Sequence, residues 1–189
     1  MEIRFDEKKH EYWFGEERII SVTTVLREAK LFDYKGTMMM AADKGTAIHT
    51  ITELDDAGQL PNEIVNPIVP YLDGWRRFKD ESKCELVATE ESVYHRIYKY
   101  AGKLDRRVRL NGREAVIDIK TGLQAPWHPI QTSLYARCFD RHMDRYCLYL
   151  PGNGDYRLIE HKNHDEDWSV GKAAILIVNW KRKQGVLKL

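Results

Sequence analysis

The chain has 189 residues, 43% of them hydrophobic and 11% aromatic, which is enough for one domain with a sizeable core. Its 30 basic and 29 acidic side chains leave a formal net charge of +1. This balance excludes a generally basic surface, so any binding of phosphate has to be local. The three cysteines, Cys84, Cys138 and Cys147, lack metal-ligand spacing and predict free thiols in a reducing compartment. With no signal peptide at the first residues and no apolar run of transmembrane length, we expect a cytoplasmic protein without membrane contact.

The N-terminal part of the chain predicts a hairpin followed by helices. Residues 10–20 alternate as two strands around a turn at Gly15-Glu16, and Ser21 is a typical N-cap for a short helix to about Lys30. A longer helix is expected over 38–57, ended by Gly58. Another is expected to open at Pro61 and to run to about Asp80.

The rest of the chain predicts mainly strands. We expect strands at 84–94, 97–110 and 113–120, then a helix that follows Pro126 and Pro129 and runs to about Asp140. Strands at 145–150 and 155–160 precede a last helix, 165–184, whose core-facing side is expected to carry Trp168, Ile175, Val178 and Trp180. This order indicates an α/β (α+β) fold in which helices flank a mixed central sheet.

One turn sets the register of two predicted strands. Asn111-Gly112 between strand-forming residues is the strongest short-range signal for a two-residue type I′ hairpin. Counting outward from this turn places Asp105 directly opposite Asp118 on one face of the sheet. Lys120 shares that face because side chains along a strand alternate with period two. Two acids and an amine around one point predict a divalent-metal site with a catalytic lysine beside it.

The alternative is that these residues are ordinary strand-end charges, because the pattern D-x-K is common by chance. Directly opposed like charges destabilise a sheet, however, so a fold gains nothing from this pair unless a cation lies between the carboxylates. A register slip or a β-bulge between the strands would remove the argument.

Two further residues are candidates for the same site. His49 shares a helical face with Glu53, and an imidazole can complete a carboxylate site for magnesium or manganese; the alternative is a structural histidine. Glu90 and Glu91 lie on the strand before Asp105. If the connection near His95 has an even number of residues, Glu90 faces the same way as Asp105, so we prefer Glu90 as an additional acid.

Several residues are candidates for contact with a polyanion. Gln131 and Tyr135 stand four apart on a predicted helix and form one polar edge, although a surface helix with a buried tyrosine is the alternative. Trp127 precedes them in a loop, where it would either stack on a base or seal the core. Arg107 belongs to a cluster of basic residues in the hairpin: Lys103, Arg106, Arg107, Arg109 and Arg113.

Four motifs together resemble the PD-(D/E)xK nuclease superfamily, in its RecB-type and phage-exonuclease branch. They are Gly45-Thr46-Ala47-Ile48-His49, Gly102-Lys103-Leu104-Asp105, Asp118-Ile119-Lys120-Thr121-Gly122 and Gln131-Thr132-Ser133-Leu134-Tyr135. The opening, from His10-x-Tyr12 to Ser21-Val22-Thr23, is also similar to that of many phage members. The resemblance implies a restriction-endonuclease-like core and a single nuclease domain over 1–189. Within that domain, 1–35 form an N-terminal hairpin and short helix, and 36–189 form the nuclease core.

The resemblance also implies roles for individual residues. Asp105 and Asp118 would bind Mg²⁺, for which Mn²⁺ substitutes, and His49 and the carbonyl of Ile119 would be further ligands. Lys120 would orient or help to deprotonate the attacking water. Gln131 and Tyr135 would contact the DNA backbone. Family members with an iron–sulphur cluster use four cysteines, and this chain has three, so we expect no iron–sulphur cluster.

The function expected from the motifs is a metal-dependent DNA exonuclease in phage or bacterial DNA recombination or processing. Its partner would be DNA, linear and with ends, and a recombination partner protein and a homo-oligomer stay open. The first alternative is a DNA-binding or assembly protein of this fold with little or no cleavage. The second is a structure-specific endonuclease.

Overall fold

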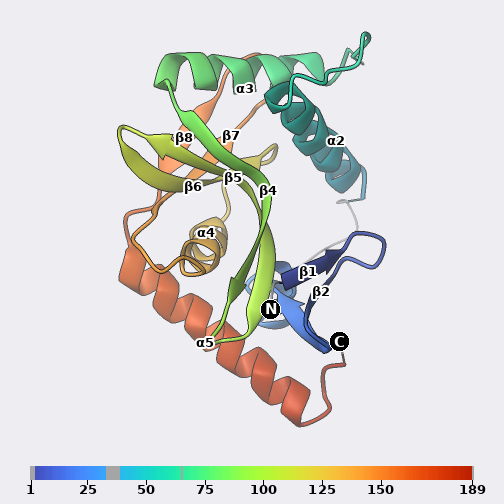
Figure 1. Cartoon of the computed structure of the whole chain (residues 1–189), viewed down its shortest axis with the longest axis vertical. Coiled ribbons are helices and arrows are strands. Elements are labelled where there is room, and N and C mark those ends of the chain that lie inside the picture. Colours follow the sequence, from blue (N-terminus) through green and yellow to red (C-terminus); the bar gives the residue numbers. More distant parts are fainter. Residues whose placement is uncertain (1–2, 33–38, 65, 189) are drawn as a thin grey trace.

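The computed structural model describes residues 3–32, 39–64 and 66–188, and Figure 1 shows the arrangement of its elements. In chain order they are β1 (Ile3–Asp6), β2 (Glu11–Phe14), β3 (Glu17–Ser21), α1 (Val22–Glu28), α2 (Met39–Asp56), α3 (Val69–Ser82), β4 (Glu85–His95), β5 (Tyr100–Leu110), β6 (Arg113–Lys120), α4 (His128–Ala136), β7 (Asp144–Tyr149), β8 (Arg157–Glu160) and α5 (His164–Lys183). None of the helices within these ranges is long and apolar enough to cross a membrane.

The strands form one mixed sheet with the order β1-β2-β3-β5-β6-β7-β8, and β4 pairs with β5. The pairs β3–β5 and β6–β7 are parallel and the others are antiparallel. The predicted fold class, a mixed central sheet flanked by helices, is therefore confirmed. The hairpin of β5 and β6 has the predicted register, because Leu110 pairs with Arg113, and Asn111 and Gly112 both have the positive φ that a type I′ turn requires.

β5 is the strand around which the sheet forks. β4 follows one edge of β5 along its length, from Glu85–Arg109 to His95–Tyr100. The other edge is shared, because β3 pairs with β5 at Tyr100–Ala101 and β6 pairs with it only from Arg106 onward. The stretch of β5 between these two pairings, which includes Asp105, therefore faces the opening between β3 and β6.

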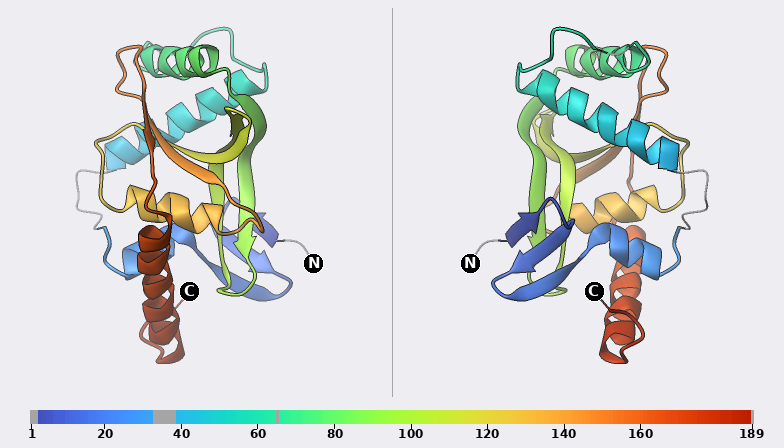
Figure 2. Two further views of the ribbon diagram at one scale, coloured as in Figure 1. Left: turned by 90° about the vertical axis from the view of Figure 1, so that its left-hand side faces the viewer. Right: turned by 90° about the vertical axis from the view of Figure 1, so that its right-hand side faces the viewer.

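Two hydrophobic clusters lie on the two sides of the sheet, which appear as an upper and a lower helical layer in Figure 2. One cluster joins α2 and α3 to the sheet and includes Ile48, Trp75, Phe78, Ile117 and Ile119. The other joins α1, α4 and α5 to it and includes Val25, Leu134, Val116, Ile175 and Val178. These layers hold α2 and α4, which carry candidate site residues, against β5 and β6.

Several element predictions are corrected by the structure. The strand β1 was not predicted; it pairs with β2 and extends the N-terminal hairpin to three strands. The helix expected from Pro61 begins only at Val69, because Pro67 disfavours helical geometry in the residue before it and Pro70 is tolerated only in a first turn. The helix expected to reach Asp140 ends at Ala136.

The expected orientation of Trp180 is also wrong, because it is 59% exposed on the outer side of α5. The boundary between 35 and 36 and the predicted helix start at Met38 lie outside the described residues.

Candidate active site

Acidic side chains from three adjacent strands form a row across the sheet. The pairs Thr89–Arg106 and Glu91–Leu104 place Glu90 on β4 opposite Asp105 on β5. The ladder between β5 and β6 ends at Arg106–Ile117, one position before Asp105 and Asp118 would pair. Beyond that point the Asp105 carboxylate itself joins the strands, because Oδ2 accepts a hydrogen bond of 2.6 Å from the Ile119 N–H.

The row lies where β5 changes face. Leu104 packs in the cluster with α4 and α5, whereas Val108 packs in the cluster with α2 and α3, although residues an even number apart on a regular strand share a face. Opposite this change, Glu90 has φ of 48°, a left-handed conformation that is uncommon outside glycine. An irregular backbone at this position turns the acidic side chains into the fork of the sheet, as bulges near functional sites often do.

His49 completes a cluster with two of these acids. One possible ligand atom from each of His49, Glu90 and Asp105 lies within 4.8 Å of the others, a spacing that can hold a metal ion. His49 reaches the row from the middle of α2, and its Nδ1 is 3.4 Å from Asp105 Oδ1. Glu90 is the carboxylate that the parity argument preferred over Glu91, and the turn between β4 and β5 has the even length that this argument needed.

The charges in this cluster affect one another. Burial opposes the protonation of His49, but the carboxylates of Asp105, Asp118 and Glu90 together outweigh it and raise the pKa of the imidazole to about 9. Burial likewise opposes ionisation of Asp105, yet the His49 and Lys120 cations hold the pKa of its carboxyl below its usual value. Burial and the Asp105 carboxylate raise the pKa of Glu90. Without a metal ion, a protonated His49 therefore supplies positive charge to Asp105, while Lys103 lies 3.3 Å from Glu90.

Asp118 is paired with Lys120 rather than with the histidine. Lys120 Nζ lies 2.5 Å from Asp118 Oδ2, and both residues stand on the same face of β6 as predicted. Burial raises the pKa of the Asp118 carboxyl to about 6, and Asp105 adds to this shift while Lys120 opposes it. Burial disfavours the ammonium of Lys120, but Asp118 and Asp105 outweigh it and raise its pKa. Lys120 is therefore an ammonium ion at neutral pH.

Residues of α4 and the preceding loop surround the amine of Lys120. Gln131 Oε1 accepts a hydrogen bond of 2.8 Å from Lys120 Nζ, and Gln131 Nε2 donates one of 3.3 Å to the Tyr135 hydroxyl. Lys120 Nζ also lies 5.0 Å from the centre of the Trp127 ring, which stacks on Phe32. Gln131 and Tyr135 are both buried. Their direct contacts thus connect α4 to the lysine, and contact with DNA stays a prediction.

One glycine of the motifs allows this close packing. A Cβ atom on Gly102 would lie 2.5 Å from Tyr135 Cε1, so only glycine leaves room for the tyrosine beside β5. At Gly45 of α2, by contrast, a Cβ would make an ordinary contact with Thr121 Oγ1 at 3.8 Å.

Sequence reasoning missed the residue that holds this arrangement together. Arg106 is fully buried, and its guanidinium donates to Asp56 at 2.8 Å and to Thr52 at 3.0 Å, both on α2. The same group donates to the Asp105 carbonyl at 2.7 Å and lies 3.5 Å from Glu90 Oε1. In the sequence, Arg106 was notable only as one of a cluster of basic residues. Such a cluster does not indicate which arginine is buried and which is solvated.

Arg107, predicted to bind DNA, is not brought to the row. Its guanidinium donates two hydrogen bonds to Glu91, at 2.7 and 3.1 Å, and a third to Glu114 at 3.4 Å. These carboxylates already compensate its charge.

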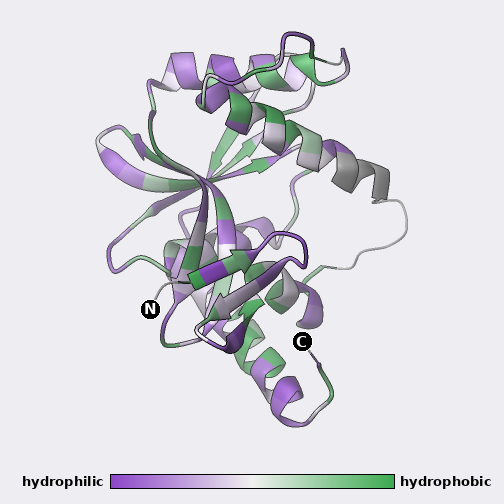
Figure 3. Ribbon diagram, turned by 45° about the vertical axis from the view of Figure 1, so that its right-hand side comes forward, coloured by the Kyte–Doolittle hydropathy of each residue, from purple (hydrophilic) through white to green (hydrophobic). Residues whose placement is uncertain are grey.

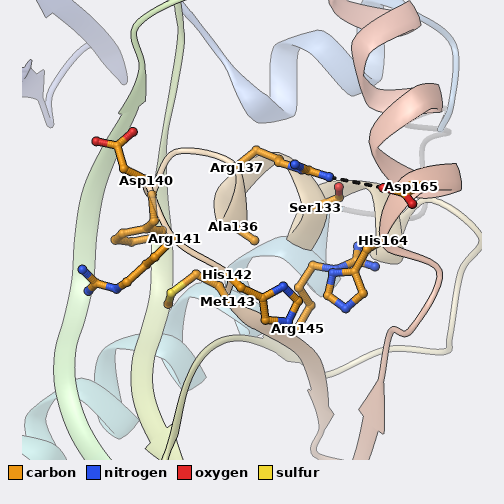
Figure 4. Close-up of a pocket in the computed structure, with 11 residues that line it drawn as sticks. Ser133, Ala136, Arg137, Asp140, Arg141, His142, Met143, Arg145, His164 and Asp165 are labelled. Carbon is orange, nitrogen blue, oxygen red and sulfur yellow. Dashed lines mark ion pairs between the residues drawn. The ribbon is translucent and has the colours of Figure 1, made fainter.

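A separate cavity of about 400 Å³ lies among α4, the loop before β7 and the start of α5. Figure 4 shows Arg137, Arg141 and Arg145 around it. Each of these arginines has a carboxylate partner, namely Asp165, Glu114 and Asp167 in turn. The positive charges of these three arginines are therefore already compensated, and the cavity is a weaker candidate than the acidic row.

Comparison with known proteins gave matches among solved structures only. Neither protein-family models nor curated proteins matched the chain. The crystal structure of SSO0001 is 19% identical, with a TM-score of 0.45 over 88% of this chain and 79% of that one. An alkaline exonuclease from Laribacter hongkongensis, LHK-Exo, is 16% identical over 90% of this chain and 95% of that one, with a TM-score of 0.40, or 0.47 for its complex with dAMP. The motifs in the sequence predicted a likeness to proteins of this kind.

Proposed function

We propose that the chain is a divalent-metal-dependent DNA nuclease that hydrolyses phosphodiester bonds, and that it acts as an exonuclease. The observation that carries this proposal is the row of carboxylates, of which Asp105 and Asp118 are buried, beside a half-buried lysine, Lys120, whose Nζ lies 2.5 Å from Asp118. Like charges so close together are unfavourable in a sheet unless a cation joins them. A fold that retains them at an open fork, beside an ammonium group, favours catalysis over structure.

The residues present fit a hard divalent cation. His49, Glu90 and Asp105 offer two carboxylates and one imidazole within 4.8 Å, and Asp118 is the next acid in the row. Magnesium needs few protein ligands and keeps several waters, and manganese accepts the same oxygen-rich set. When bound, such an ion supplies positive charge to the phosphodiester and lowers the pKa of water.

The chain's own residues perform the remaining tasks in this proposal. Lys120, as an ammonium ion, donates hydrogen bonds to the attacking water or to a phosphate oxygen and stabilises negative charge there. Asp118 and Gln131 hold its amine from two sides, so that its position is set before substrate binds. Because Lys120 is protonated at neutral pH, it orients the water rather than deprotonating it.

A cleavage assay separates this function from the DNA-binding or assembly alternative. End-labelled linear DNA would be incubated with the wild-type protein in magnesium, in manganese and in chelator. We expect cleavage that needs the metal and is lost in Asp118→Asn. The matched control is Asp80→Asn, which changes an exposed aspartate paired with Lys83 on α3. Binding without cleavage in either metal would favour the alternative instead.

A second experiment tests the metal site without reference to activity. Because an ion that binds only the native state stabilises it, magnesium should raise the melting temperature of the wild-type protein. Asp105→Asn should abolish that increment, whereas Asp80→Asn should retain it. An equal increment in Asp105→Asn would place the ion elsewhere.

A further inference from the structure

The outer side of α5 carries an apolar stripe that the fold leaves uncovered. Val170, Ala173, Leu176, Ile177 and Trp180 are exposed and recur at the three- and four-residue spacing of one helical face. Leu176, Ile177 and Trp180 are 58%, 48% and 59% exposed. The opposite face of the helix already packs on the core through Ala174, Ile175 and Val178. Hydropathy colouring shows α5 as a helix of alternating green and purple bands (Figure 3).

The two ends of the stripe carry opposite charge. The first turn of α5 holds Asp165, Glu166 and Asp167, and the last turn holds Lys181, Arg182 and Lys183. Asp167 is paired with Arg145, and Lys181 donates to the Glu28 carbonyl. Among the described residues, no ion pair involves Glu166, Arg182 or Lys183. The stripe therefore ends in an available acid at one side and available bases at the other.

We propose that this face binds a second copy of the chain, with the two α5 helices antiparallel about a twofold axis near residue 175. In that arrangement Trp180 of each copy meets Val170 of the other, since both lie roughly 7.5 Å from the axis at 1.5 Å per residue. Ile177 meets the small Ala173, which allows close approach. Glu166 of each copy meets Lys183 of the other. A twofold interface has to be self-complementary, and this stripe is so in the sizes of the residues that meet and in their charge.

A groove beside the stripe extends the same surface. It has a volume of about 720 Å³, shares Leu176 and Trp180 with the stripe, and includes the exposed Ile97 of the β4–β5 turn. Arg182 and Lys183 also line it, as does Lys99, which is paired with Glu17 at 2.9 Å. The acidic first turn of the second copy would lie at this basic rim. The proposed dimer goes beyond the proposed nuclease function and does not depend on it.

Sedimentation velocity over a range of protein concentrations tests the dimer. We expect the wild-type protein to show a mass of two chains that dissociates on dilution. Ile177→Asp should weaken the dimer by roughly tenfold or more, because a charge then lies in the apolar centre. The matched control, Leu123→Asp, places the same charge at an exposed leucine outside α5 and should leave the dimer intact. A wild-type chain that is monomeric throughout would overturn the proposal.

A charge exchange tests the antiparallel arrangement and involves no apolar position. Glu166→Lys and Lys183→Glu should each weaken the dimer, because each places like charges together across the axis. The double variant should restore it, because every cross-axis pair is again of opposite sign. A dimer that neither single variant weakens, or that the double variant fails to restore, would overturn this interface. Circular dichroism of each variant confirms that it is folded.

Discussion

At the scale of single residues, the candidate site is a set of charges that each require the others. Lys120 is kept as an ammonium by Asp118 and Asp105, and His49 is kept protonated by Asp105 when no metal is bound. Removal of one of these residues therefore removes its ion pair and also changes the pKa values of its neighbours.

Lys120 is the residue whose loss should separate catalysis from binding. Lys120→Ala should reduce cleavage by about 10²-fold or more, because in the proposed function its amine stabilises the developing negative charge. DNA affinity should stay within several-fold, because one charge is a small part of a footprint with many phosphate contacts. The measurements are single-turnover cleavage and DNA binding in chelator. Lys83→Ala, at the exposed lysine that directly follows α3, is the control. Near-normal turnover in Lys120→Ala would show that the proposed catalytic role is wrong.

The protonation of His49 predicts a pH-dependent stability of the metal-free protein. The pKa of His49 is raised from 6.5 to about 9 in the folded state. A raised pKa means that the folded state binds the proton more tightly, so this stabilisation is fully present below pH 6.5 and is lost between pH 6.5 and about pH 9. Melting temperatures in chelator across this range should fall with pH in the wild-type protein.

In His49→Gln the part of the fall in melting temperature that comes from this histidine should be absent. A fall of the same size as in the wild-type protein would show that His49 is not the group that titrates. Because a metal ion competes with the same proton, magnesium binding should strengthen over the same pH interval.

At the scale of elements, the site depends on how closely three of them approach. β5 carries glycine at residue 102 so that Tyr135 of α4 can lie against it, and Val22 of α1 is also near this point. Arg106 fastens α2 to β5 through Asp56 and Thr52. The elements that carry His49, Asp105 and Gln131 are thus held by contacts outside the row itself.

The packing at Gly102 predicts an asymmetry between two glycines of the motifs. Gly102→Ala should destabilise the fold by about 1–3 kcal/mol, because its Cβ would overlap the Tyr135 ring and the neighbouring elements have to shift. Gly122→Ala should cost much less, because nothing lies within 4 Å of the added atom. Urea denaturation measures both. Adding Tyr135→Ala should make the effect of Gly102→Ala smaller, and strict additivity of the two changes would contradict the overlap.

At the scale of the whole molecule, the near-neutral charge of the chain constrains how the proposed nuclease would hold DNA. With a net charge of +1, attraction to the phosphate backbone has to come from local contacts near the fork of the sheet. Contacts to the backbone position a nucleic acid without reading its sequence. The proposed exonuclease function, to which the four motifs gave rise, adds the expectation of attack at ends.

End dependence is therefore the prediction at this scale. Linear DNA should be degraded from its ends with little sequence preference, while relaxed closed circles survive under the same conditions. Cleavage should weaken strongly as salt rises, because binding is mostly to phosphate. Gel analysis of both substrates in parallel is the measurement. Rapid cutting of circles at a few discrete sites would favour the endonuclease alternative and leave the metal site intact.

Local rules in the sequence determined the register of the central hairpin and the placement of Lys120 beside Asp118. The Asn-Gly turn set the register of β5 and β6, and alternation along the strand put Lys120 beside Asp118, since both rules act over a few covalently connected residues. Pro67, which delays the start of α3, is also a local signal, but the helix expected over 61–80 did not take it into account.

Only the tertiary structure decided which distant residues meet. His49 joins Glu90 and Asp105 because α2 packs over the fork, and Gln131 turns toward Lys120 because α4 packs from the other layer. Arg106 became a buried link, whereas the neighbouring Arg107 pairs with Glu91 and Glu114. Whether each of two adjacent basic residues is buried, like whether Trp180 is exposed, depends on what packs against each face of an element. Periodicity identifies such a face, but the partner that covers it is chosen by the packing of the whole chain.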